Sequence, residues 1–138
     1  MACSSGRGSR KVVGQPERRQ RLQATLELGL DLPFFMPAFE RYHKLFDDFE
    51  IALDRSLWLV DDGFSLAEVG YAPCLARLRH LGFDVLFEWH PRVTEWSERV
   101  AKMPSVVEGV ERWSNPKYLA LFAEKRPEVI ARISRLAG

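Results

Sequence analysis

The strongest constraint on the fold is an apolar stripe between residues 39 and 53. Large apolar side chains recur there at intervals of three and four residues: Phe39, Tyr42, Phe46, Phe49 and Leu53. An α-helix turns once every about 3.6 residues, so this spacing places all of them on one helix face. Charged residues occupy the other positions of the segment. The pattern predicts an amphipathic helix whose aromatic face packs into a core.

The stretch "GFSLAEVGYAP" predicts the beginning of another helix. The hydroxyl of Ser65 can accept a backbone N–H of the first helical turn. The carboxylate of Glu68, three residues later, can accept the N–H of Ser65, which makes a capping box. Phe64 and Val69 stand at the positions of a hydrophobic staple, and Gly63 suits the preceding turn. We interpret these residues as structural, because a helix cap does no chemistry.

Proline and glycine predict most of the remaining helix ends. Proline is tolerated in a first turn, where its missing N–H would have no helical partner, and glycine accepts the left-handed backbone that follows a last turn. This reasoning places helices between three pairs of residues: Pro16 and Gly29, Ser65 and Gly82, and Pro91 and Pro104. Pro73 lies inside the second helix and predicts a kink near Val69 and Gly70.

The C-terminal part carries further helix signals. Ser105 and Glu108 match a second capping box, which would open a short helix reaching Trp113. Asn115 followed by Pro116 predicts the start of another helix, and Pro127 is expected to interrupt it. Strand-like alternation, hairpin turns and internal repeats are missing from the sequence. The chain is therefore predicted to be all-α, an orthogonal bundle of about six or seven helices over residues 16–138.

Residues 1–15 are predicted to be a basic, disordered tail. Residues 1–21 hold six basic side chains and one acidic side chain, while the rest of the chain has an acidic excess. A basic arm can bind nucleic acid, but this one has no aromatic residue that could stack on bases. A solvated tail is the favoured interpretation, so nucleic acid and membranes are not among the expected partners.

The cysteine content favours a reducing, cytoplasmic setting. Cys3 and Cys74 are the only two cysteines, one in the tail and one inside a helical pattern, so they do not form a disulfide framework. We expect Cys74 to be a small buried apolar residue. The N-terminus lacks the apolar segment of a secretory signal.

Catalytic and metal-binding motifs are not found. His43, His80 and His90 are scattered, and no two of them have the i, i+4 spacing of a helical zinc site. His43 and Asp47 have that spacing, but they would make one contact rather than a site. Phosphate loops, dinucleotide-binding glycines and nucleophile elbows are also missing. The residues therefore predict no catalytic, cofactor-binding or metal-binding side chain.

Residues 58–83 resemble the C-terminal helical domain of glutathione S-transferases. In that family a tryptophan-leucine turn precedes an aromatic residue, a capping serine or threonine, and a central helix that contains a proline followed by arginine and leucine. The matching residues are Trp58, Leu59, Asp62, Phe64, Ser65, Leu66, Ala67, Val69, Pro73, Arg77 and Leu78. The downstream segment resembles the family at Pro91, Val93, Trp96, Arg99, Pro104 and Ser105. Residues 29–53 are similar to bacterial, β-etherase-like members, and the resemblance spans roughly residues 22–113.

The sequence departs from the family in three ways. Glu68 stands where the family usually has aspartate, which preserves the capping box, and "VDDG" modifies the preceding turn. The larger departure is that no βαβ pattern is found, although the family binds glutathione in an N-terminal thioredoxin-like domain. The resemblance thus implies glutathione as the cofactor of full-length members, but no cofactor site in this chain.

Two main hypotheses follow from the resemblance. In the first, the chain is a truncated or fragmentary transferase that contributes the hydrophobic-substrate half and is inactive alone, with a thioredoxin-like domain or a second copy as partner. The family then implies Trp113, Tyr118 and Phe122 as substrate-binding residues, with core packing as their alternative role. In the second, the chain is a stand-alone protein-interaction module with the same fold.

Overall fold

The structure, a computed structural model, describes residues 16–60 and 63–137. This part of the chain contains seven α-helices, two short 3₁₀-helices and no strand. The α-helices are α1 (Pro16–Leu28), α2 (Phe35–Leu53), α3 (Leu66–Leu81), α4 (Asp84–Trp89), α5 (Pro91–Ala101), α6 (Pro104–Gly109) and α7 (Pro116–Ala137). The 3₁₀-helices are η1 (Gly29–Asp31) and η2 (Glu111–Trp113). The predicted all-α class is confirmed.

The chain divides into two compact units between residues 36 and 37. In the first unit, α1 begins at Pro16 and ends before Gly29, as predicted, and Gly29 has a φ of 54°. None of the α1 side chains is buried. The second unit holds the hydrophobic core. The predicted domain of residues 16–138 therefore includes residues of both units. Its N-terminal boundary stays a prediction.

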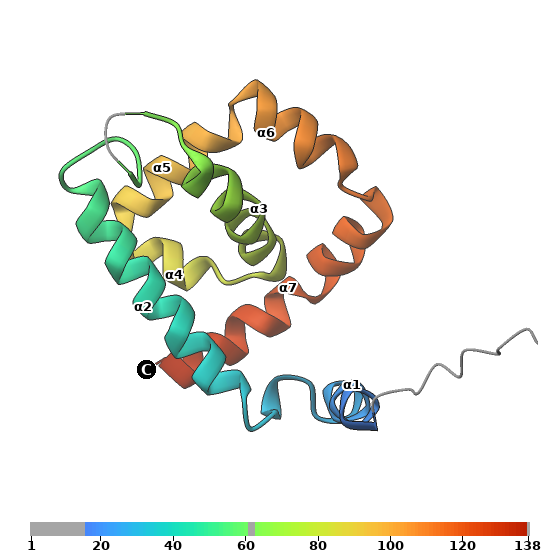
Figure 1. Cartoon of the computed structure of the whole chain (residues 1–138). Coiled ribbons are helices and arrows are strands. Elements are labelled where there is room, and N and C mark those ends of the chain that lie inside the picture. The colour runs from blue at the N-terminus through green and yellow to red at the C-terminus, as the bar shows by residue number, and fades with distance from the viewer. Residues whose placement is uncertain (1–15, 61–62, 138) are drawn as a thin grey trace, which may run out of the picture. The chain divides into compact units, whose positions relative to one another are not determined.

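Helix α3 is the central element of the second unit. It packs against α5 and α7, and the shorter α4 also contacts both of those helices (Figure 1). The most deeply buried apolar side chains come from five of the helices: Phe46, Leu75, Leu86, Val93, Trp96, Val100 and Ile133. The predicted stripe of α5, formed by Val93, Trp96 and Val100, lies entirely in this core.

The aromatic face of α2 also enters the core, except at one position. Phe39, Phe46, Phe49 and Leu53 are buried, whereas Tyr42 is 37% exposed. The ring of Phe46 meets Phe87 of α4 edge-on, with centroids 5.0 Å apart. The helical spacing therefore predicted the buried face correctly, except that it also assigned the partly exposed Tyr42 to that face.

The start of α3 has the hydrogen bonds of a capping box. The Ser65 hydroxyl accepts the backbone N–H of Ala67 at 3.1 Å, and the Glu68 carboxylate accepts the N–H of Ser65 at 2.8 Å. The ring of Phe64 packs edge-on against Trp58, and the Val69 side chain is half exposed. The staple between Phe64 and Val69 stays a prediction.

Gly82 ends α3 in the left-handed conformation predicted for it. Its φ is 88°, its N–H bonds the carbonyl of Arg79 at 3.2 Å, and the N–H of Phe83 bonds the carbonyl of Leu78 at 3.1 Å. These are the two closing bonds of a Schellman motif. Pro73 lies inside α3, and the helix continues through it.

Two of the expected helix boundaries are wrong. The Ser105–Glu108 pair makes no capping box, because α6 begins at Pro104, two residues before the start that this box predicts, with Met103 as the cap residue and no side-chain cap bond. Pro127 does not interrupt its helix, since α7 runs continuously from Pro116 to Ala137. Helix α7 packs on both α3 and α4, and this packing compensates for the backbone hydrogen bond that the proline removes.

Cys74 is exposed, which corrects the prediction that it is buried. It lies two residues beyond the buried Ala72 and one before the buried Leu75, so its side chain falls on the outer face of α3. The structure also adds a short helix that the sequence did not reveal, α4, between Gly82 and His90. The predicted tail of residues 1–15, which includes Cys3, lies outside the described residues.

Candidate functional site

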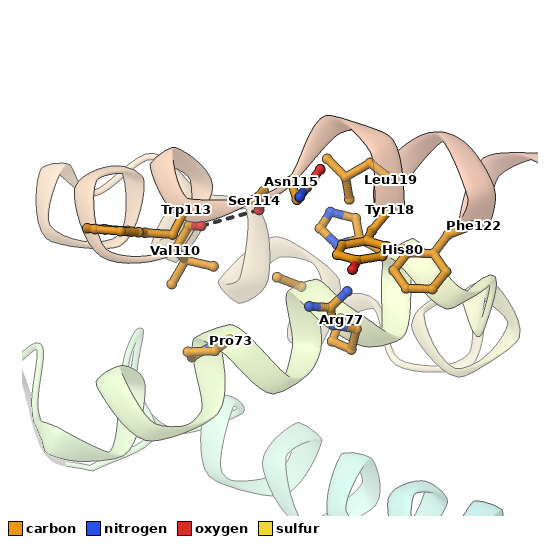
Figure 2. A pocket seen from close by; sticks show the side chains of 11 residues that line it. Pro73, Arg77, His80, Val110, Trp113, Ser114, Asn115, Tyr118, Leu119 and Phe122 are labelled. Carbon is orange, nitrogen blue, oxygen red and sulfur yellow. Dashed lines mark hydrogen bonds between the residues drawn. The ribbon is translucent and has the colours of Figure 1, made fainter.

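An open cleft of about 640 Å³ lies in the second unit, between α3 and the segment from Val110 to Phe122. All three predicted substrate-binding residues, Trp113, Tyr118 and Phe122, line it. Figure 2 shows Trp113 at the opposite end of the cleft from Phe122, with Tyr118 between them on α7. The three residues that the family resemblance implied thus line one cleft.

None of these three aromatic side chains belongs to the core. Trp113 is 81% exposed and Tyr118 is 57% exposed, while Phe122 is partly exposed. Exposed aromatic side chains that border a concavity keep contact area available for a ligand. The exposure of these residues argues against the alternative of core packing, and their substrate-binding role stays a prediction.

The opposite wall of the cleft comes from α3. Pro73, Arg77 and His80 face the aromatic residues of α7 (Figure 2). The guanidinium carbon of Arg77 lies 5.3 Å from the centroid of the Phe122 ring, within the range of a cation–π contact. The spacing of Pro73, Arg77 and His80 places them on one side of the helix, since they are three and four residues apart.

Local hydrogen bonds fix the turn that carries the aromatic wall. The Asn115 side chain accepts the N–H of Lys117 at 3.0 Å, so Asn115 caps α7 as predicted. The hydroxyl of Ser114 donates to the carbonyl of Val110 at 3.2 Å (Figure 2). These bonds set the direction in which α7 leaves the turn. Tyr118 and Phe122, four residues apart, then share one face of that helix.

The cleft is apolar and aromatic, with a positive charge on one wall. Its lining includes the guanidinium of Arg77 and the ring of His80 but no carboxylate. Such a surface can stack a flat apolar ligand and attract an anionic group on it. The hydroxyl of Ser114, which also lines the cleft, donates its hydrogen bond to the Val110 carbonyl.

A second cavity, of about 280 Å³, lies between α3, α5 and α6. His80 lines both cavities, and Trp96 lines only the second. The indole Nε1 of Trp96 is buried, and no hydrogen-bond partner for it is found among the described residues. Buried donors of this kind are commonly satisfied by water when the adjacent space is large enough.

Two histidines and an aspartate gather at another place in the second unit. Ring nitrogens of His43 and His90 and a carboxylate oxygen of Asp47 all lie within 4.8 Å of one another. The sequence predicted no metal site, because only the pair His43 and Asp47 has helical spacing. His90 comes 43 residues after Asp47, and only the fold brings its ring to 3.1 Å from the carboxylate.

Comparison with protein families identifies the helical unit. The model of the glutathione S-transferase C-terminal domain matches residues 34–104, slightly more than half of the chain. The chain belongs to this family. The matched residues run from the start of α2 to the first residue of α6, so they include the α3 wall of the cleft. The aromatic wall, from Trp113 to Phe122, follows the match. No solved structure was found that matches the chain.

Among residues 16–60 and 63–137 of this glutathione S-transferase C-terminal domain protein, no helix is both long enough and apolar enough to cross a bilayer.

Proposed function

We propose that the chain is the hydrophobic-substrate domain of a glutathione S-transferase-like protein and that its aromatic cleft binds the substrate. The observation that carries this proposal is that Trp113, Tyr118 and Phe122 line one open cleft of about 640 Å³. The family membership supports it, because the chain matches the C-terminal domain of these enzymes. The relationship to β-etherase-like members and a cytoplasmic location stay predictions.

The lining of the cleft indicates the chemical class of the ligand. Three aromatic rings provide flat apolar contact area, and Arg77 provides a fixed positive charge beside Phe122. A flat aromatic compound that carries a carboxylate or sulfonate would satisfy both features. Removal of one aromatic side chain should therefore weaken binding without abolishing the fold, because none of the three is buried.

The residues do not fit glutathione itself. Glutathione S-transferases hold that cofactor in a thioredoxin-like domain built on a βαβ unit, and the described residues of this chain form helices only. We therefore propose that the chain alone does not conjugate glutathione and that a thioredoxin-like domain, supplied by a partner or by another segment, would complete the enzyme. This chain would then contribute the wall that orients the electrophile.

A fluorescence titration with anilinonaphthalene sulfonate tests the cleft. The dye is aromatic and anionic, and its emission rises in an apolar site. We expect saturable binding that weakens by about tenfold in Tyr118→Ala and in Phe122→Ala, since a lost aromatic contact costs about 1–1.5 kcal/mol. Arg77→Gln should weaken binding of the sulfonate more than binding of an uncharged naphthalene.

Trp89→Ala is the matched control for this titration. Trp89 is also a partly exposed aromatic residue, but it packs beside His43 on α2, away from the cleft lining. Its substitution should leave the affinity for the dye unchanged. Equal affinities in the parent and in both α7 variants would overturn the proposal.

An activity assay tests the proposed inactivity. The purified chain, mixed with glutathione and a chloronitrobenzene electrophile, should not raise the rate above the uncatalysed reaction. Turnover that disappears when a residue of this chain is substituted would contradict the proposal.

A stand-alone interaction module is the second candidate function. Large apolar side chains are exposed in and before the first turns of α3, at Leu57, Leu66 and Val69. Exposed apolar residues near one another in the sequence favour a protein contact, including one between two copies of the chain. Light scattering tests this alternative, because a chain that stays monomeric at all concentrations would count against it.

A further inference from the structure

The imidazole of His90 is buried between α2, α4 and α5. Its residue is 4% exposed, and both ring nitrogens have defined neighbours. Nδ1 lies 2.5 Å from the carbonyl oxygen of Leu86, and Nε2 lies 3.1 Å from a carboxylate oxygen of Asp47. A carbonyl oxygen can only accept a hydrogen bond, so Nδ1 must carry a proton.

This proton fixes the state of the other nitrogen. In the neutral ring, Nε2 then has a lone pair, and that lone pair faces the negatively charged oxygen of Asp47 at 3.1 Å. Two acceptors at this distance repel each other unless a positive centre lies between them. A proton on His90 or a metal ion bound by both atoms can supply that centre.

The position of His43 distinguishes a bound metal ion from a proton shared by His90 and Asp47. A proton shared between His90 and Asp47 needs no third ligand, yet a ring nitrogen of His43 lies within 4.8 Å of both other ligand atoms. The rings of His43 and His90 have centroids 5.5 Å apart and meet at 69°. His43 is only partly exposed, and the ring of Trp89 packs edge-on against it, with centroids 5.3 Å apart.

We propose that His43, Asp47 and His90 bind one divalent metal ion of the zinc class. Two imidazole nitrogens and one carboxylate oxygen are ligands that zinc prefers, with a fourth position open to water. The hydrogen bond from His90 Nδ1 to a backbone carbonyl is the usual support for a metal-bound histidine, because it orients the ring and aims Nε2 at the ion.

The distances are close to those of a tetrahedral site. Zinc bonds of about 2.0–2.1 Å place neighbouring ligand atoms about 3.3 Å apart. The atoms of His90 and Asp47 already have nearly this separation, at 3.1 Å. A side-chain rotation of the partly exposed His43 closes the remaining distance. The ion would connect α2 to the junction of α4 and α5, so it should also stabilise the fold.

Calorimetric titration with zinc chloride tests the site. The full chain is used with Cys3→Ser and Cys74→Ser, which removes the thiols as competing ligands. We expect one zinc ion per chain, no binding of magnesium, and at least about a tenfold loss of zinc affinity in His43→Ala and in Asp47→Asn. Both variants change residues that are not buried, which keeps the fold intact for the comparison.

His80→Ala is the matched control, because it removes the one remaining histidine, which lines the aromatic cleft instead. Its zinc affinity should equal that of the parent, and zinc should raise the Tm of the parent and of His80→Ala but not of His43→Ala. The proposal is overturned if zinc does not bind saturably, if His43→Ala binds it as tightly as the parent, or if His80→Ala loses it equally.

Discussion

The carboxylate of Glu68 accepts the backbone N–H of Leu59 at 2.7 Å, nine residues earlier in the chain. The same carboxylate accepts the N–H of Ser65 at 2.8 Å and its hydroxyl at 2.6 Å. The Glu68 residue is completely buried, with 0% exposure. One side chain therefore closes the capping box and also holds the loop that precedes α3, and these hydrogen bonds compensate for the burial of its charge.

Ser65→Ala should lower the free energy of unfolding by about 1–2 kcal/mol. The substitution removes the acceptor of the Ala67 N–H and one of the hydrogen bonds to the buried Glu68 carboxylate. Urea unfolding at neutral pH measures the change. Ser105→Ala is the matched control, because Ser105 has the same sequence pattern but makes no cap bond. Equal losses in the two variants would contradict the capping role.

Glu68 should make the fold sensitive to acid. Burial raises the pKa of Glu68, but hydrogen bonds from the Ser65 hydroxyl and from backbone N–H groups outweigh burial and hold the pKa below its ordinary value of 4.5. The charged form is thus favoured in the folded state. The stability that this group contributes is fully present above pH 4.5 and is lost as the pH falls through the lower folded pKa.

Unfolding measured across this acid range checks the pH dependence. The parent should lose stability more steeply below pH 4.5 than Glu68→Gln, which has no carboxyl group to protonate. Glu40→Gln, which removes an exposed carboxylate of α2, should follow the parent curve. Parallel curves for the parent and Glu68→Gln would show that the buried carboxylate does not control acid stability.

Glu50→Ala should destabilise the fold by roughly 1–2 kcal/mol, because Glu50 of α2 caps a different helix. Its carboxylate accepts the backbone N–H groups of Arg92 and Val93, at 3.2 and 3.1 Å, in the first turn of α5. Asp54→Ala is a suitable control, since Asp54 pairs with the side chain of Arg92 and is mostly exposed. Its effect on urea unfolding should be clearly smaller.

Gly82→Ala and Gly70→Ala should have opposite effects. Gly82 has a φ of 88°, and an added Cβ would lie 3.0 Å from Cγ of Arg126, so alanine should cost about 1–2 kcal/mol. At Gly70, inside α3, an added Cβ meets nothing within 4 Å, and alanine should stabilise the helix by about 0.5–1 kcal/mol. Thermal unfolding of both variants measures the difference, and a shift of the same sign in both would refute it.

Local chemistry explains which parts of the fold the sequence predicted. The cap at Ser65, the left-handed Gly82 and the first-turn Pro91 involve atoms only a few residues apart. Their geometry follows from short stretches of chain. The stripes of α2 and α5 follow from helical periodicity, which depends on the same short range.

The wrong predictions concern positions where contacts between distant segments determine the structure. Pro127 was expected to end a helix because proline removes one backbone hydrogen bond and its ring crowds the preceding turn. The structure keeps α7 continuous, with Ile133 buried beyond the proline and Arg126 bonded through two nitrogens to Asp84. The packing of α7 against distant helices stabilises it by more than the proline destabilises it. The sequence of α7 alone does not show how strongly those helices pack against it. Cys74 was misplaced for a similar reason, since residue type does not reveal which helix face meets the core.

The all-α class, most helix starts and the family follow from the sequence, because these depend on local hydrogen bonding, periodicity and ordered motifs. It also indicated Trp113, Tyr118 and Phe122, but not that they would face Arg77 across one cleft. Three features depend on how the helices pack: the cleft, the cap that Glu50 gives to α5, and the contact of His90 with Asp47. Each joins side chains from separate helices, and their distances are set by how the helices pack in three dimensions.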